Sequence, residues 1–285
     1  MTHVKGKFYN WHTRFRHRFL HRPIRLKVVY DTKNKHPQLT VIFLHGISAT
    51  SATWRTTIRQ LSINPDLKGV RFVALDLLGF GKSLQAAWLD YDYLDYEKAL
   101  ENTLKQLKIT SPVVLIGHSM GSLIAANYAV NYQSAFDIAN LILVSPPVLM
   151  SEELAKLPDR VYTKSYSSLY HLAKDEPAIE VIANFVQRFS SFSSRYIKTP
   201  AFERSMDNVI LNHDNYRTFT KIKIPTLILH GHFDPLVMRS NLKKVAAANP
   251  QYIRFISVIG HHDISTQKRN KIMIELKRIL REQNV

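Results

Sequence analysis

The chain has 285 residues, of which 45% are hydrophobic and 21% charged, and it contains no cysteine. This length and composition favour one soluble globular domain with a sizeable core, while the lack of cysteine excludes disulfides, thiolate metal sites and cysteine nucleophiles. The formal net charge of +17 favours anionic partners, but no zinc-finger spacing or RNA-recognition motif accompanies it, so no nucleic-acid partner is expected.

Residues 1–23 form a basic segment in which Trp11, Phe15 and Phe19 stand four residues apart. On a helix these three rings share one face, so the segment is predicted to be an amphipathic helix. We expect the aromatic face to pack on the rest of the domain, with peripheral contact to a membrane as the alternative. The interspersed arginines interrupt the apolar stretch that a secretory signal needs, and the expected location is the cytoplasm.

From residue 24 onward, short apolar runs rich in β-branched residues alternate with longer stretches that suit helices. Strands are predicted at residues 25–30, 40–44, 71–75, 113–116, 141–144, 226–229 and 254–258, and a closing helix over 267–282. This alternation indicates an α/β fold with a mostly parallel central sheet flanked by helices.

The strand signal stops over residues 148–220, where the sequence predicts an inserted helical cap. Apolar side chains recur at helical spacing over residues 178–189. The insertion divides the predicted core domain into residues 24–147 and 221–285.

The sharpest motif is Gly-x-Ser-x-Gly at residues 117–121, which follows an apolar strand and precedes a helix-forming run. Ser119 is therefore predicted to be a nucleophile at a sharp strand-to-helix turn, where small neighbours are needed because the backbone is crowded. A serine hydroxyl is a weak nucleophile, so this prediction requires a histidine base and an acid that orients it.

Both partners are found later in the chain, just beyond predicted strands, where open α/β sheets build their sites. Asp234 is the predicted acid, because the first carboxylate after the preceding strand is the more distant Glu152. The base is one of two adjacent histidines, His261 and His262. Side chains of adjacent loop residues generally point apart, so only one of the two is expected to reach Ser119.

Two backbone amides are needed where negative charge develops on an attacked carbonyl. One is expected from Met120, directly after the nucleophile. The other is expected from Ile47, which follows Gly46 at the end of an early strand. His45 and His118 each lie beside a turn glycine and are expected to make structural hydrogen bonds.

Together these motifs, with the loop at residues 76–83, resemble the α/β-hydrolase superfamily from about residue 24 to the C-terminus. The order of serine, aspartate and histidine is the order in that superfamily. There the catalytic histidine usually follows a glycine directly, so the resemblance implies His261 as the base. The residue after a His-Gly pair usually supplies the second oxyanion amide, which implies Ile47, and an insertion after the sixth strand covers the pocket.

The expected function is that of a carboxylesterase-like serine hydrolase, which cleaves small-molecule esters with small to medium acyl chains through an acyl-enzyme. No cofactor or metal is expected. Serine at the elbow argues against the dehalogenases and epoxide hydrolases of this fold, which use aspartate there. The alternatives are a carbon–carbon bond hydrolase, a lipase or thioesterase, and a ligand receptor without turnover. The sequence leaves the acyl preference and the oligomeric state open.

Overall fold

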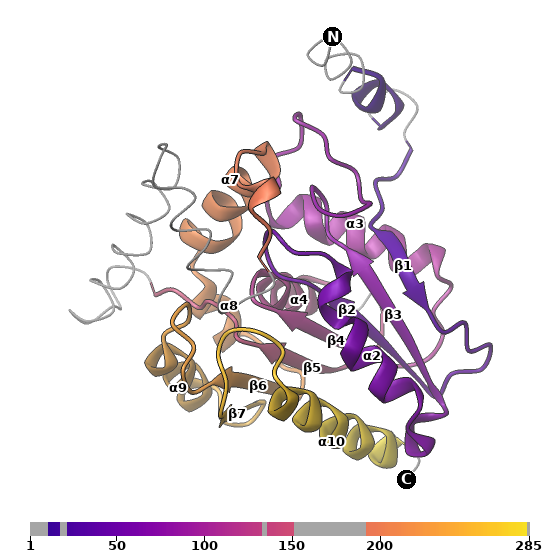
Figure 1. Cartoon of the computed structure of the whole chain (residues 1–285), viewed down its shortest axis with the longest axis vertical. Coiled ribbons are helices and arrows are strands. Elements are labelled where there is room, and N and C mark those ends of the chain that lie inside the picture. Colours follow the sequence, from indigo (N-terminus) through magenta and orange to yellow (C-terminus); the bar gives the residue numbers. More distant parts are fainter. Residues whose placement is uncertain (1–10, 18–21, 133–135, 151–191, 284–285) are drawn as a thin grey trace.

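The central sheet is the frame on which all other elements are placed. The computed structural model describes residues 11–17, 22–132, 136–150 and 192–283. Within these residues, seven strands form one sheet in the order β1-β3-β2-β4-β5-β6-β7 (Figure 1). The strands are β1 (Lys27–Asp31), β2 (Leu39–Leu44), β3 (Val70–Asp76), β4 (Val113–His118), β5 (Ile138–Val144), β6 (Thr226–Gly231) and β7 (Ile253–Val258). All seven coincide with predicted strands.

The sheet is parallel except at one edge. From β3 to β7 every neighbouring pair of strands is parallel. The edge strand β1 instead runs antiparallel to β3, with a register shift between Val28 and Tyr30. Val29 and Tyr30 are 42% and 43% exposed, as is usual for an edge strand that packs on one side only. The predicted α/β fold with a mostly parallel sheet is confirmed.

Helices cover both faces of the sheet, because its central strands are apolar on both sides. On one face, α2 (Arg55–Ser62) and α10 (Thr266–Gln283) share a core with β2 and β4. On the other face lie α3 (Tyr93–Gln106), α4 (Met120–Asn131) and α9 (Arg239–Ala248). Short 3-10 helices are η1 (Ser51–Trp54), η2 (Pro65–Leu67) and η3 (Ser194–Tyr196). None of the described helices is long and apolar enough to cross a membrane.

The described end of the predicted insertion is helical. It contains η3, α7 (Pro200–Ser205), the π-helical turn η4 (Met206–Leu211) and α8 (Asn215–Thr220). Both η4 and α8 pack against α4, the helix that follows the predicted nucleophile. Residues 151–191, including the predicted helix over 178–189, lie outside the described residues, so the cap as a whole stays a prediction.

The N-terminal helix packs on the domain through its polar side. Residues 11–17 are helical, and the Trp88 indole donates a 3.0 Å hydrogen bond to Thr13. Trp11 and Phe15 stack on each other at 5.6 Å and are 62% and 39% exposed. The expectation that the aromatic face covers the domain is therefore wrong for Trp11, and Phe15 is covered only in part. The reason is that Trp88 presents an N–H donor to the helix, and a hydroxyl can accept from it while an aromatic face satisfies it poorly. Phe19 lies outside the described residues.

Candidate active site

Ser119 occupies the sharp turn that the sequence predicts between a strand and a helix. Its backbone dihedrals, φ 52° and ψ −122°, lie in a region that residues other than glycine rarely adopt. A Cβ at Gly117 would lie 2.4 Å from the backbone of Ser122, and one at Gly121 would lie 2.5 Å from the His45 carbonyl oxygen. Glycine is thus required on both sides of Ser119, which stands at the positive end of α4.

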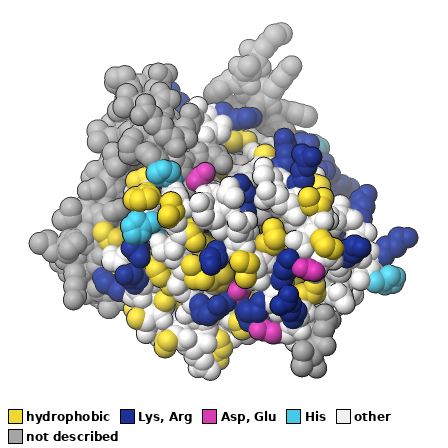
Figure 2. All heavy atoms as spheres, turned by 60° about the horizontal axis from the view of Figure 1, so that its bottom comes forward, with side chains coloured by type: hydrophobic (Ala, Val, Ile, Leu, Met, Phe, Trp, Pro, Cys, Tyr) yellow, Lys and Arg dark blue, Asp and Glu magenta, His cyan; other side chains and the backbone are white. Residues whose placement is uncertain are grey.

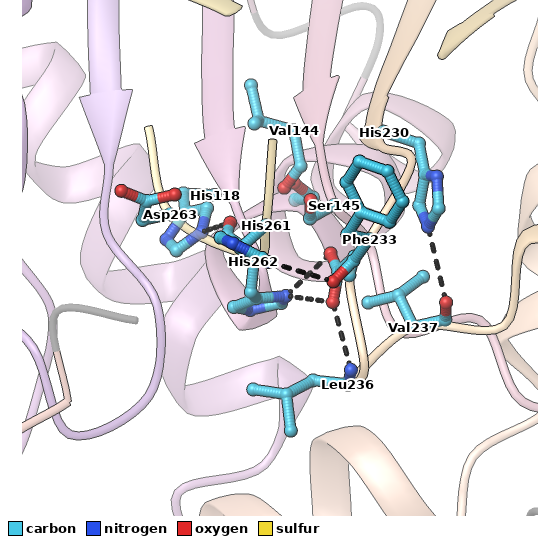
Figure 3. Close-up of polar contacts among 12 residues, drawn as sticks. His118, Val144, Ser145, His230, Phe233, Leu236, Val237, His261, His262 and Asp263 are labelled. Carbon is cyan, nitrogen blue, oxygen red and sulfur yellow. Dashed lines mark hydrogen bonds and ion pairs between the residues drawn. The ribbon is translucent and has the colours of Figure 1, made fainter. Parts of the chain in front are cut away.

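The predicted acid pairs with a buried histidine from the loop after β7. His262 Nδ1 lies 2.9 and 3.1 Å from the two carboxylate oxygens of Asp234 (Figure 3). The side chains are 5% and 0% exposed, respectively. Because the carboxylate accepts the proton on Nδ1, the ring leaves Nε2 as an acceptor.

This histidine is His262 and not the expected His261. His261 is exposed, and its Nδ1 donates to the backbone carbonyl of Phe233 at 3.1 Å (Figure 3). The two side chains point apart as expected, but it is His262 that faces Asp234 and His261 that points to the surface. Gly260 has φ 147°, a conformation open to glycine, and the chain leaves this turn with His261 outward and His262 inward.

Asp234 is held as an anion by several neighbours. Its Oδ1 accepts a 2.9 Å hydrogen bond from the Leu236 amide, and the Ser145 hydroxyl lies near enough to lower the pKa of the same carboxylate. Burial by itself raises the pKa of Asp234, but the His262 ring, the Lys268 ammonium and the Ser145 hydroxyl hold that pKa below its ordinary value. The carboxylate is therefore ionised throughout the neutral range.

The loop after β2 lies beside Ser119, the predicted nucleophile. A Cβ at Gly46 would lie 3.1 Å from the Cβ of Ser119. Among the described residues, the backbone hydrogen bonds of loops and turns use neither the Ile47 amide nor the Met120 amide. The Met120 amide is thus next to Ser119 in the chain, and the Ile47 amide belongs to the loop that lies beside Ser119 in space. Both N–H groups are available to donate a hydrogen bond to a substrate.

The same loop is tied to the predicted cap. The Ser48 hydroxyl donates to the Ser193 carbonyl at 2.6 Å, and the Ser193 amide donates to the Ser48 carbonyl at 2.8 Å. A segment of the insertion therefore lies one residue away from a predicted oxyanion amide.

His45 and His118 make structural hydrogen bonds. His45 Nδ1 donates to the Gly46 carbonyl at 2.7 Å, and Nε2 accepts from the Leu77 amide at 2.9 Å. Burial lowers the pKa of His45 to about 4 and that of His118 well below its ordinary value, so both rings are neutral. His118 Nε2 donates to the His262 carbonyl at 2.9 Å, which joins the elbow to the loop that carries His262.

Two residues near the site were missed from the sequence, Ser145 and Lys268. The Lys268 ammonium lies 3.0 Å from the Ser145 hydroxyl, and both residues are fully buried. A signal for Lys268 exists in the sequence. It shares the buried stripe of α10 with Ile272, Leu276 and Ile279, and a lysine in an apolar stripe needs interior partners.

Solved structures of other proteins share this fold. The esterase EaEST from Exiguobacterium antarcticum superposes with a TM-score of 0.69 at 21% identity, covering 90% of this chain and 95% of that one. A thermophilic esterase from Thermogutta terrifontis also gives 0.69, at 19% identity and with 91% and 94% coverage. At these identities the likeness is one of fold.

Related sequences include hydrolases. The AB hydrolase superfamily protein YisY of Bacillus subtilis (strain 168) is 27% identical over 210 residues, which are 68% of this chain and 74% of YisY. Lipase 1 of Psychrobacter immobilis is 25% identical over 248 residues, 82% of this chain and 75% of the lipase. Coelenterazine h 2-monooxygenase of Renilla reniformis is 33% identical, but the match spans only 36% of this chain and 32% of that protein.

A family model described as serine aminopeptidase, S33 (Hydrolase_4), matches residues 35–262, which runs from before β2 to His262. This range contains the turn at Ser119, the predicted acid Asp234 and both histidines. Since the match covers most of the chain and the sheet has the corresponding fold, this protein belongs to that family of α/β hydrolases.

Proposed function

We propose that this protein is a serine hydrolase that cleaves carboxylic esters with small to medium acyl chains, with Ser119 as nucleophile, His262 as base and Asp234 as acid. The observation that carries the proposal is the buried pair of Asp234 and His262 beside the strained elbow. His118, the residue before Ser119, is bonded to the His262 backbone and its ring lies 4.9 Å from the His262 ring. These contacts put His262 next to the residue that precedes Ser119, which supports a site at the ends of the strands, where this fold builds its sites.

The reaction follows from this geometry. The Ser119 hydroxyl oxygen attacks the ester carbonyl while its proton passes to Nε2 of His262, and the ionised Asp234 stabilises the resulting imidazolium. The carbonyl oxygen becomes an oxyanion, to which the amides of Ile47 and Met120 donate. His262 then returns the proton to the leaving alkoxide, and the alcohol departs from the acyl-enzyme. A water molecule attacks in the same way, releases the acid and restores Ser119.

We also propose that residues 148–220 form a cap over the substrate. The paired hydrogen bonds between Ser48 and Ser193 support this, because they bring the insertion against the loop of the oxyanion amide. Esterases and a lipase among the similar proteins favour ester substrates. The family description favours an aminoacyl amide as the substrate to test in parallel.

The test is covalent labelling followed by a substrate panel. A fluorophosphonate probe should label the wild-type protein at Ser119, and Ser119→Ala should abolish both labelling and ester turnover, with a kcat lower by roughly 10⁶-fold and an unchanged circular dichroism spectrum. The panel runs from p-nitrophenyl acetate to p-nitrophenyl laurate, with an aminoacyl p-nitroanilide alongside. Labelling of a different serine, or turnover retained by the alanine variant, would remove the proposed nucleophile.

We further propose that the N-terminal helix contacts anionic membrane surfaces. Trp11 and Phe15 are exposed on it, and the chain carries a formal net charge of +17. The helix carries Arg14 and Arg16, and Figure 2, which brings the bottom of Figure 1 forward, shows lysine and arginine side chains spread over that other face too, with few acidic ones among them. Exposed aromatic rings together with basic charge favour binding at the interface of an anionic bilayer.

A further inference from the structure

Helix α10 carries a lysine side chain into the interior of the protein. Lys268 is fully buried. Its Nζ lies 2.7, 3.1 and 2.8 Å from the backbone carbonyl oxygens of His261, His262 and Asp263, and 3.0 Å from the Ser145 hydroxyl. A buried ammonium is costly unless its hydrogen bonds are satisfied. Here three N–H donors face four oxygens, so the surroundings satisfy the ammonium fully.

The three carbonyls belong to consecutive residues. Successive carbonyls of an extended chain point in different directions, so they converge on one donor only when the loop curls around it. The ammonium therefore defines the path of the backbone at residues 261–263. The His262 carbonyl also accepts a hydrogen bond from His118, so the residue is held by two donors from different elements.

Lys268 also connects to the acid. It bonds to Ser145, and its positive charge, like the Ser145 hydroxyl, favours the ionised form of the Asp234 carboxylate. One side chain thus supports both halves of the Asp234–His262 pair, the acid through Ser145 and the histidine through its backbone.

We propose that Lys268 is a positioning residue for the proposed reaction, which holds the loop at residues 261–263 so that His262 keeps Nδ1 against Asp234. The proposal rests on the hydrolase function given above. Lys268 has no exposed surface and acts through the loop and Ser145. A shift of about 1 Å in a catalytic group can lower turnover about 100-fold, so this support is expected to affect kcat more than KM.

The dependence of kcat on pH above neutrality distinguishes this positioning role from a purely structural one, because a purely structural role would leave that dependence unchanged. Burial lowers the pKa of Lys268 to about 8, although nearby carboxylates oppose this shift. As the pH rises through about 8, the ammonium loses its charge and one N–H donor. The titratable groups that face it from other elements are Asp234, Asp263, His118, His230 and His262. Wild-type kcat should therefore fall above about pH 8.

The decisive variant is Lys268→Met, with Lys277→Met as its matched control. Lys277 lies on the same helix and pairs with Asp66 away from the site. Lys268→Met should lower kcat about 100-fold with KM within about threefold, and its activity should be flat above about pH 8. Lys277→Met should stay within about twofold of wild type and keep the alkaline fall. Assays are run at a temperature where circular dichroism shows each variant folded.

A second variant decides the matter if Lys268→Met does not fold. Ser145→Ala removes an acceptor of the ammonium, so the alkaline fall of kcat should begin at a lower pH than in the wild type. The proposal is overturned if folded Lys268→Met keeps wild-type kcat, or if wild-type kcat is constant to about pH 10 and Ser145→Ala changes nothing. Failure of the hydrolase function itself looks different, because then the wild-type protein neither reacts with the fluorophosphonate nor turns over esters.

Discussion

The loop at residues 260–263 and the helix at residues 11–17 are both short and rich in histidine, yet they are held very differently. In the loop, His262 is 4% exposed, and its backbone carbonyl accepts two hydrogen bonds. One comes from His118, which is distant in the chain, and the other comes from Lys268, which lies on α10. In the helix, a hydrogen bond between Thr13 and Trp88 attaches the polar side, and Trp11 is 62% exposed. Buried hydrogen bonds fix which way a side chain points, whereas an amphipathic pattern alone does not say which face packs.

The largest expected effect separates the two histidines of the loop. His262→Ala should lower kcat by roughly 10⁶-fold, because it removes the proposed base for the Ser119 proton. His261→Ala, the matched control, loses an exposed ring bonded to the Phe233 carbonyl and should stay within about tenfold of wild type. Steady-state kinetics on a p-nitrophenyl ester measure both. Equal losses of kcat in the two variants would show that turnover depends on the conformation of the loop and not on the His262 ring.

A smaller loss is expected when the proposed acid is made neutral. Asp234→Asn should lower kcat about 10⁴-fold, since an amide fills the same space but favours the wrong tautomer of His262. The variant should also lose stability, because the wild-type carboxylate has a depressed pKa in the folded state. That depression stabilises the fold above the unfolded-state pKa of an aspartate and is lost as the pH falls further. Kinetics and thermal melts at neutral and acidic pH test this. Near-normal turnover would make another carboxylate the acid.

The smallest effect on the fold is expected at the N-terminal helix. Deleting residues 1–22 removes the hydrogen bond between Thr13 and Trp88, worth about 1 kcal/mol, and should lower Tm by about 2 °C. Binding to vesicles of phosphatidylserine and phosphatidylcholine should be lost, and in the full chain it should weaken with salt.

A double variant, Trp11→Ala with Phe15→Ala, serves as the control for this deletion. It should reproduce the loss of vesicle binding while lowering Tm by no more than the deletion does, since Trp11 is 62% and Phe15 39% exposed. A large drop in Tm in either protein, together with no vesicle binding by the full chain, would instead support packing on the domain.

The sequence was sufficient to predict the frame of the molecule. Apolar runs of strand length found all seven strands, and the closing helix predicted over residues 267–282 is observed as Thr266–Gln283. The turns with small residues located the elbow at Ser119, because the steric need for glycine is local in the chain. The antiparallel direction of β1 could not be predicted, since the direction of an edge strand depends on which neighbour it pairs with.

The sequence was not sufficient to choose between His261 and His262. The position after a glycine favoured His261, but the direction of a loop side chain depends on backbone dihedrals and on distant donors. Lys268 is six residues further on, in a helix, and its partners become apparent only when α10 packs against the ends of the strands. For the same reason Ser145, which links Lys268 to the acid, could not be recognised from a serine followed by two prolines.

Ser119 has the dihedral angles φ 52° and ψ −122°, which glycine adopts far more readily than serine. Folding therefore disfavours serine at this position by about 1–3 kcal/mol, and selection for the proposed turnover would explain why serine is present. In a lineage that keeps the fold but no longer needs the reaction, this position would drift towards glycine before Gly117 or Gly121 changed, because their lack of a side chain is required by the fold itself. Under the proposed function, a change of the residue at position 119 would thus be the first sign that such a lineage had lost the reaction.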